Sequence, residues 1–205
     1  MKKGKFIIFE GNEGTGKTTH LNFVSSYLND KNIKNEITRE PGGTEFGESL
    51  RDILLDNKSQ LDPLSEALLF HSARVVNYNN IKNALDNGIY VICDRFHYST
   101  LVYQGIVESN KKVQEMHKLL DPFFSEKISL IFYLCASPKT SSDRINNREN
   151  TDKFESQGIN YFEKIHHAYE DTFKNNNKVI KIDTSKNKEL VQKEITEHLD
   201  RIINE

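Results

Sequence analysis

A glycine-rich octapeptide near the start of the chain has residue types and spacing suited to holding phosphate. It reads Gly-Asn-Glu-Gly-Thr-Gly-Lys-Thr over residues 11–18 and fills every fixed position of the pattern G-x-x-x-x-G-K-[ST]. Such glycines let successive backbone N–H groups point at phosphate oxygens, and a following helix adds the positive end of its dipole. The octapeptide therefore predicts a site for a nucleoside triphosphate, ATP or GTP. The competing interpretation is a glycine-rich turn capped by Thr18.

The last two residues of this loop have separate predicted tasks. Lys17 should bridge the β- and γ-phosphates, and Thr18 should be a ligand of Mg²⁺. Neither an N-K-x-D base-reading motif nor a D-x-x-G switch motif occurs in the sequence, so ATP is favoured over GTP. The loop alone leaves open whether the γ-phosphoryl group passes to water, passes to a small molecule or serves as a conformational signal.

Arginine is scarce, and its positions indicate a second anion. The chain has 21 Lys and 7 Arg, and only the planar guanidinium makes bidentate contacts to phosphate or carboxylate. Arg39, Arg51 and Arg95 lie at or near the ends of predicted strands, where ligands of open parallel sheets sit. We therefore expect an acceptor that carries its own phosphate. For Arg51, the alternative is a pair with Glu48 or Asp52.

Five further side chains have a spacing that permits a pocket for a planar base. Phe70 and Arg74 are separated by one helical turn, as are Thr100, Tyr103 and Gln104 at i, i+3 and i+4. An aromatic ring can stack on a base, while Arg, Thr and Gln supply hydrogen bonds and Tyr supplies bulk near a sugar. Taken singly, Phe70 is more often a core residue, Arg74 a residue of a solvated face and Gln104 a surface residue.

A second pair of arginines indicates a lid. Arg144 and Arg148 stand at i and i+4, where like charges cost a helix about 0.2–0.5 kcal/mol, so an anion between them is expected. Residues 149–158 are polar and end in glycine. This composition predicts a mobile lid over about 144–158 that closes over phosphates during transfer. The alternative is an exposed helix end with Arg148 paired to Asp152.

Short apolar runs predict the strands that position these motifs. Residues 6–9, 90–93 and 130–135 are continuous apolar runs, as expected for strands covered on both faces, and 179–182 and the more polar 33–39 complete the set. Helical patterns alternate with them at 17–30, 45–56, 62–87, 98–121, 137–149, 158–175 and 188–203. This order predicts a right-handed α/β fold, with a parallel sheet of about five strands covered by helices on both faces, in one domain over residues 1–205.

Length and charge narrow the class of partner. A 205-residue domain buries about 70% of its unfolded surface without metal or disulfide staples. The formal net charge of −2 gives no indication of a nucleic-acid or anionic-membrane partner, and no apolar stretch reaches the roughly 18 residues of a membrane span. Cys93 and Cys135 lie in apolar runs without C-x-x-C spacing. They are expected to be buried free thiols, and a reducing cytoplasm is the expected compartment.

Taken together and in order, these motifs resemble the bacterial thymidylate kinase family over nearly the whole chain. The likeness rests on G-N-E-G-T-G-K-T-T at 11–19, T-R-E-P-G-G-T at 38–44, Leu50-Arg51, Phe70-x-x-x-Arg74, D-R-F at 94–96, S-T-x-x-Y-Q-G at 99–105 and the arginine-rich lid. The resemblance implies a fold of the P-loop NTPase type and reversible transfer of the ATP γ-phosphoryl group to dTMP, giving dTDP. It also implies Mg²⁺ and a homodimer.

The resemblance assigns roles position by position. Phe70 is similar to the residue that stacks on thymine, Arg74, Thr100 and Gln104 to those at its edge, and Tyr103 to the one that crowds a 2′-hydroxyl. Glu13 resembles the acid near the 3′-hydroxyl. Arg51 and Arg95 match the positions that hold the dTMP phosphate, and Asp94 matches the acid linked to Mg²⁺-bound water. Arg39 belongs to the acceptor-binding set without a specific role.

Members of the family place a catalytic arginine in the phosphate loop or in the lid. The loop here contains none, so Arg148, with Arg144 as a second candidate, is expected to stabilise the transferring phosphoryl group. Two departures concern the lid: Lys153 stands where many relatives have Arg, and residues 106–112 lack an Arg-Gly pair. The residues expected to contact ATP are Gly11, Asn12, Glu13, Gly14, Thr15, Gly16, Lys17, Thr18, Thr19 and Arg144.

Two other functions fit parts of the pattern. A kinase acting on a nucleoside or on another nucleoside monophosphate would share the loop but differ in the acceptor pocket. A nucleoside kinase needs a carboxylate base for a neutral hydroxyl instead of arginines for a phosphate. A P-loop ATPase switch would hydrolyse ATP on meeting a macromolecular partner and would transfer phosphate to no monophosphate.

Overall fold

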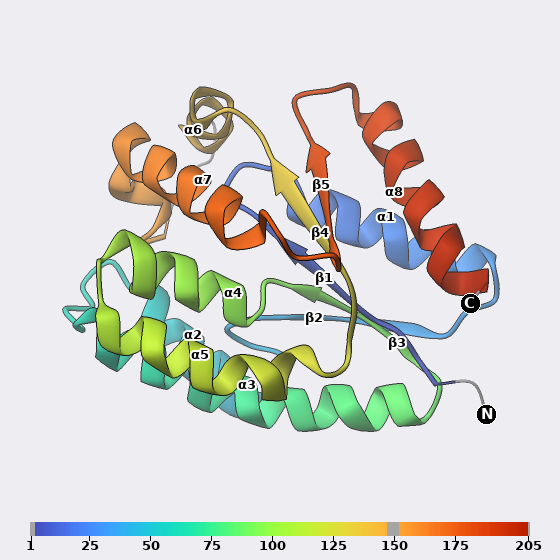
Figure 1. Cartoon of the computed structure of the whole chain (residues 1–205), viewed down its shortest axis with the longest axis horizontal. Coiled ribbons are helices and arrows are strands. Elements are labelled where there is room, and N and C mark those ends of the chain that lie inside the picture. Colours follow the sequence, from blue (N-terminus) through green and yellow to red (C-terminus); the bar gives the residue numbers. More distant parts are fainter. Residues whose placement is uncertain (1–2, 147–151, 205) are drawn as a thin grey trace.

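A computed structural model gives the arrangement of the chain, and the structure describes residues 3–146 and 152–204. Five parallel strands form one sheet in the order β2-β3-β1-β4-β5 (Figure 1). Their bounds are β1 Phe6–Glu10, β2 Asn35–Arg39, β3 Tyr90–Asp94, β4 Ile128–Cys135 and β5 Val179–Asp183. The predicted α/β class and the five-stranded parallel sheet are confirmed.

Helices cover both faces of the sheet (Figure 1). On one face lie α1 (Lys17–Asp30) and α8 (Lys188–Asn204). Toward the other lie α2 (Glu45–Leu55), α3 (Pro63–Asp86), α4 (His97–Thr100), a π-helix (Leu101–Val107), α5 (Lys111–Ser125), α6 (Pro138–Asn146) and α7 (Ile159–Phe173). Each face therefore has its own apolar core.

The position of β1 in the sheet explains why its sequence is continuously apolar. Ile7 and Phe9 point into the core under α1 and α8, whereas Phe6 and Ile8 point into the core on the opposite face. Successive side chains of a strand alternate between faces, and here both faces are buried. The central strand thus ends in the middle of the sheet edge, and the glycine-rich loop follows it directly.

The segment after β3 differs from the expected single helix over 98–121. It consists of the short α4, the π-helix and then α5, with a break at Ser109 and Asn110. Ser109 has a positive φ of 52°, and the Asn110 side chain accepts a hydrogen bond from the Val113 N–H, which caps α5. The extra residue per turn of a π-helix changes which side chains face the sheet edge.

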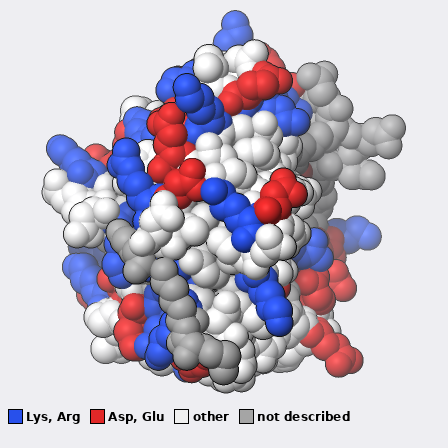
Figure 2. Space-filling view, turned by 90° about the vertical axis from the view of Figure 1, so that its right-hand side faces the viewer, with Lys and Arg blue, Asp and Glu red and all other residues white. Residues whose placement is uncertain are grey.

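Three expectations from composition can be compared with the structure. Cys93 and Cys135 are buried free thiols, as predicted. Among the described residues, no helix is both long and apolar enough to cross a membrane. Figure 2 shows basic and acidic side chains interspersed on the face in view, in keeping with a net charge near zero.

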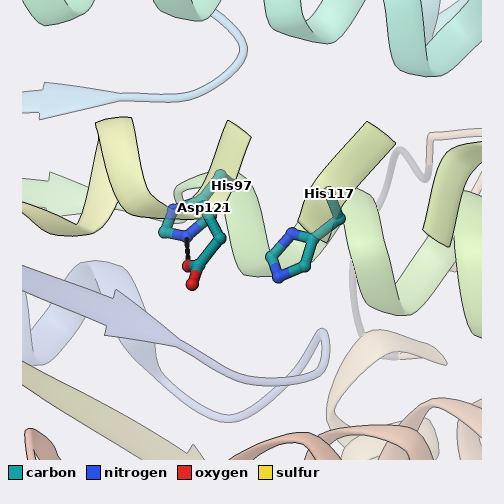
Figure 3. Close-up of side chains that lie close together, drawn as sticks. All are labelled: His97, His117 and Asp121. Carbon is teal, nitrogen blue, oxygen red and sulfur yellow. Dashed lines mark hydrogen bonds and ion pairs between the residues drawn. The ribbon is translucent and has the colours of Figure 1, made fainter. Parts of the chain in front are cut away.

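Three buried histidines form a cluster that joins α3, α4 and α5: His71, His97 and His117. His97 Nε2 lies 2.8 Å from Asp121 Oδ1 (Figure 3). The Ser125 hydroxyl donates to the same oxygen at 2.6 Å. The His117 ring packs beside His97, with centroids 5.3 Å apart. Ligand atoms of His97, His117 and Asp121 lie within 4.8 Å of one another, a spacing that a metal could exploit. Because the Asp121 carboxylate is already engaged by His97 and Ser125, we interpret these three residues as a structural hydrogen-bond network against which the His117 ring packs.

We expect this cluster to make the fold sensitive to mild acid. Burial lowers the pKa of His71 to about 2, of His97 to about 3 and of His117 to about 4, with the charge of Arg74 acting in the same direction. The unfolded chain binds protons near pH 6.5 and the folded chain does not, so stability is present above pH 6.5 and falls below it. Urea unfolding at pH 7.5, 6 and 5 should show a loss of about 1–2 kcal/mol per buried histidine.

A matched pair of variants tests whether the buried histidines cause this dependence of the unfolding free energy on pH. His117→Asn should make the fall in unfolding free energy between pH 7.5 and pH 5 shallower, whereas His167→Asn, at an exposed position of α7, should leave it unchanged. Equal slopes in the wild type and His117→Asn would contradict the assignment.

Candidate functional site

The glycine-rich loop wraps around the side chain of Lys17. Lys17 Nζ donates to the carbonyl oxygens of Gly11 (3.1 Å) and Asn12 (2.8 Å). Gly11 has a φ of 136°, and a Cβ there would lie 2.1 Å from the Leu134 carbonyl oxygen, so only glycine fits. Gly16 is left-handed and precedes the first turn of α1. The loop and the first turn of α1 therefore line one cleft.

Lys17 is held in a buried, cationic setting. Burial, followed by the charge of Arg95, lowers the pKa of Lys17 to about 8. A bound polyanion would oppose both effects and favour the charged ammonium. The cleft has a volume of about 840 Å³, and its wall brings together the predicted phosphate-binding side chains: Lys17, Thr18, Thr19, Arg39, Arg51, Asp94 and Arg95.

A second cleft of about 490 Å³ adjoins the first and contains the predicted base pocket. Its wall includes Phe70, Arg74, Thr100, Tyr103 and Gln104, so the structure brings all five together from α3, α4 and the π-helix. Glu13, Arg51 and Arg95 line both clefts. The arrangement can therefore hold two phosphorylated ligands that meet at one point.

Arg95 stands at this junction because of an unusual backbone. Its φ of 66° turns the chain out of β3, while its N–H still donates to the Phe9 carbonyl of β1 at 2.9 Å. Nη2 donates to Glu13 Oε1 at 2.7 Å. Nη1 lies within hydrogen-bonding distance of Gly11 O (2.8 Å), Ser99 Oγ (3.1 Å) and Tyr169 Oη (3.2 Å). Arg95 Nε donates to no acceptor among the described residues, which leaves a donor for a ligand.

Glu13 connects the loop to the base pocket. Its second oxygen accepts a hydrogen bond from the Tyr103 hydroxyl at 2.6 Å. The Arg95 guanidinium lies 5.2 Å from the Tyr103 ring centroid, a cation–π distance. One carboxylate thus fixes both the arginine at the junction and the aromatic ring beside the acceptor cleft.

Glu10, at the end of β1, is a functional candidate that the sequence analysis missed. It is fully buried, and Oε1 accepts from the N–H groups of Phe96 (2.9 Å) and Ser99 (3.2 Å). Oε2 accepts from the hydroxyls of Ser99 (2.6 Å) and Tyr169 (2.8 Å). Since both hydroxyls also contact Arg95, Glu10 orders the loop that carries Arg95. The available signal was a carboxylate that directly follows four apolar strand residues.

Arg74 is fully buried, which excludes the alternative of a solvated face. Its Nε donates to Glu40 Oε2 at 2.5 Å, Nη2 donates to Thr100 Oγ1 at 3.1 Å, and Nη1 lies 3.0 Å from His71 Nδ1. Asn77 supplies a further hydrogen bond to Glu40 at 3.3 Å. Arg74 is therefore fixed in one orientation by the protein itself. The buried carboxylate of Glu40 was not anticipated.

The two remaining arginines near the sheet edge differ in their partners. Arg39 is exposed and pairs with Glu48 at 2.7 Å. Arg51 donates to the Pro41 carbonyl at 2.9 Å and forms no ion pair with Glu48 or Asp52 among the described residues. Arg51 therefore keeps its charge at the boundary of the two clefts.

Arg144 binds to the far side of the loop. It donates to the carbonyl oxygens of Gly14 (3.1 Å) and Thr184 (2.9 Å) and lines a third cavity of about 790 Å³ beside residues 14–16. Thr184, Lys186 and Lys188 also line this cavity and were not predicted. Arg148, predicted to act on the transferring phosphoryl group, lies outside the described residues, as do residues 149–151 of the expected lid.

One oxygen in the first cleft has the character of a cation ligand. Asp94 Oδ1 is buried and has no hydrogen-bond partner among the described residues, and Asp94 lines the same cleft as Thr18. Carboxylate and hydroxyl oxygens are the ligands that Mg²⁺ prefers. These two side chains fit a magnesium site.

Comparisons with known proteins agree with this geometry. The sequence model described as thymidylate kinase matches residues 9–195. The chain is 36% identical over 204 residues to a thymidylate kinase of Caldicellulosiruptor saccharolyticus and 34% identical over 206 residues to one of Francisella tularensis subsp. novicida, with 98% of each chain covered. A solved thymidylate kinase of Candida albicans shares the fold, with a TM-score of 0.80 at 20% identity over 98% of this chain and 93% of that chain.

Proposed function

The chain belongs to the thymidylate kinase family and phosphorylates dTMP to dTDP with ATP. We propose that the transfer takes place at the junction of the two clefts and uses Mg²⁺. The observation that carries the proposal is Arg95, which lines both clefts next to Lys17 and Glu13. An acceptor phosphate and a donor γ-phosphate placed on either side of this guanidinium would be brought together in line.

We assign the first cleft to the ATP triphosphate. The loop N–H groups and Lys17 would hold the β- and γ-phosphates, and the cavity beside Arg144 would receive the rest of the nucleotide. Thr18 and Asp94 would hold Mg²⁺, which neutralises charge on the triphosphate when bound. The unpartnered, buried Asp94 oxygen supports this placement.

We assign the second cleft to dTMP. Phe70 would stack on the base, with Arg74, Thr100 and Gln104 at its edge and Glu13 near the 3′-hydroxyl. Arg51 and Arg95 would bind the 5′-phosphate, with Arg39 at the outer edge. The second pKa of that phosphate is near 6, so it is largely a dianion at pH 7 and needs no base to make it nucleophilic. The protein's task is to position two anions and offset their repulsion, with Arg148 as the predicted lid contribution.

Tyr103 is proposed to exclude a ribose 2′-hydroxyl. Tyr103→Ala should reduce the preference for dTMP over its ribose counterpart, measured as the ratio of the two kcat/KM values, by about tenfold. Tyr103→Phe keeps the ring and loses only the hydrogen bond to Glu13, so it should retain most of the preference. An unchanged ratio in the alanine variant would contradict the role.

Apolar side chains exposed on neighbouring helices support a homodimer. They include Phe46 and Ile53 on α2 and Leu68 and Val75 on α3, each 42–51% exposed, and α2 packs against α3. We propose that a second copy of the chain covers these two helices, and light scattering would measure the mass. We also place the enzyme in the cytoplasm, which suits its two free thiols.

A coupled assay of ADP formation tests the proposed function. Wild-type enzyme with ATP and Mg²⁺ would be given dTMP, dUMP, dCMP, AMP and GMP in turn. ADP formation should depend on the acceptor and be fastest with dTMP. ADP formation independent of all five acceptors would instead favour the ATPase switch, and activity with thymidine in place of dTMP would favour a nucleoside kinase.

A further inference from the structure

Glu66 is a buried carboxylate of α3 to which the roles above assign nothing. Its side chain is 6% exposed, and its two oxygens have different partners. Oε2 accepts a hydrogen bond from Gln104 Nε2 at 3.0 Å. Oε1 forms a short ion pair with Lys153 Nζ. One carboxylate therefore links the acceptor cleft to the segment that follows the lid arginines.

The hydrogen bond from Gln104 to Glu66 fixes which end of the Gln104 amide faces the carboxylate. An ionised carboxylate only accepts hydrogen bonds, so it holds the NH₂ end of Gln104 and leaves the carbonyl end for another partner. Gln104 Oε1 accepts no hydrogen bond from the described residues, and Gln104 lines the acceptor cleft. The cleft thus offers an acceptor at this position. Thymine and uracil carry a donor N3–H on that edge, whereas the N3 of cytosine is an acceptor.

The contact to Lys153 anchors the next residue in the cleft wall. Phe154 is buried, meets the Tyr103 ring edge-to-face with centroids 5.6 Å apart and lines the same cleft as Phe70. A cavity of about 570 Å³ behind this wall is lined by Glu66, Lys153 and Tyr161, among others. Both partners of the Glu66–Lys153 ion pair line this cavity. Holding Lys153 therefore holds Phe154 against the sugar side of the acceptor site.

We propose that Glu66 is a positioning residue that fixes Gln104 for a base with a donor N3–H and, through Lys153, seats Phe154 on the same ligand. The proposal rests on the proposed function, in which Gln104 lies at the base edge. It assigns Lys153 to the acceptor side of the reaction and gives it no contact with ATP. Base recognition and the seating of residues 152–154 then depend on one charge.

Two substitutions separate this role from simple structural support. Glu66→Gln keeps an oxygen that can accept from Gln104, but its amide can also donate, so the orientation of Gln104 is no longer fixed. Lys153→Met keeps an unbranched apolar stem and removes the charge. The measurements are kcat and KM for dTMP, dUMP and dCMP, KM for ATP, and the melting temperature of each variant.

We expect Glu66→Gln to lower the dTMP-to-dCMP ratio of kcat/KM by about tenfold and to affect dTMP and dUMP in parallel, since both carry N3–H. Lys153→Met should lower kcat with dTMP by about tenfold and leave KM for ATP within about twofold. The double variant should be no worse with dTMP than the more affected single variant, because both changes break one linkage. Lys153→Arg should restore activity, and Lys164→Met, an exposed lysine on α7, is the matched control.

Several outcomes would overturn the proposal. They are an unchanged dTMP-to-dCMP ratio in Glu66→Gln, losses that multiply in the double variant, and a rise in KM for ATP confined to Lys153→Met. If Glu66→Gln does not fold, the Lys153 variants still decide. Lys153→Arg keeps the charge beside Glu66, and the melting temperature of Lys153→Met reports the cost of leaving that carboxylate unpaired. Failure of the proposed function is distinct: the wild type itself would then show no preference for dTMP.

Discussion

Replacing Arg95 with alanine is expected to lower kcat/KM for dTMP by about 10³-fold, the scale at which a charged group aimed at transferring phosphate acts. Arg95 is one of the side chains that line both clefts, and its Nε donates to no acceptor among the described residues. Removing it leaves Glu13 facing two anions without its 2.7 Å partner. Attraction at the junction then becomes repulsion, so kcat should fall as well as affinity for dTMP.

Two further variants show whether charge or shape is lost. Arg95→Lys keeps the charge but not the planar fork that reaches Glu13 and Gly11 together, so we expect activity between that of the wild type and the alanine variant. Arg201→Ala, on α8 at the exposed C-terminal end, is the matched control and should be silent. Steady-state kinetics with circular dichroism would measure both function and folding. A loss below tenfold in Arg95→Ala would contradict the role at the junction.

The sequence predicts the frame of this fold well because apolar runs are strong local signals. The continuous runs at 6–9, 90–93 and 130–135 became central strands, since a parallel sheet buries both faces of each strand. The prediction of a single helix over residues 98–121 was wrong. The i, i+3, i+4 spacing of Thr100, Tyr103 and Gln104 suits a helix of either pitch, so it does not reveal the π-helix or the break at Ser109.

The sequence predicted which cationic side chains belong to the site, but it gave much less information about the carboxylates that hold them. Arginine is rare enough in this chain that each position is informative, and the described arginines of the candidate set lie at the clefts or on the loop. Glutamate is common and usually solvated, so nothing local marks Glu40 or Glu66 as buried, and Glu10 is marked by the four apolar strand residues before it. Their burial follows from which helices pack over them. That is a tertiary property, and it decides which cations are held in place.

The buried pair of Arg74 and Glu40 should dominate stability at the site. Arg74→Ala is expected to lower the free energy of unfolding by about 3–5 kcal/mol, because it leaves the Glu40 charge buried without its partner. Both side chains are at most 3% exposed, and among the described residues the Glu40 carboxylate then keeps only the hydrogen bond from Asn77. Urea unfolding at pH 7.5, above the titration of the histidine cluster, measures the loss.

The ion pair of Arg39 and Glu48 provides the control. Its length of 2.7 Å is similar, and Arg39 directly precedes Glu40 in the sequence. Those side chains are 54% and 43% exposed, so Arg39→Ala should cost less than about 1 kcal/mol. Combining Arg74→Met with Glu40→Gln should recover part of the loss seen in Arg74→Ala, because no uncompensated charge stays in the core. Equal costs for Arg39→Ala and Arg74→Ala would mean that water reaches Glu40. Glu40 would then not hold the Arg74 guanidinium in one orientation, and Arg74 could not select the base in the acceptor cleft.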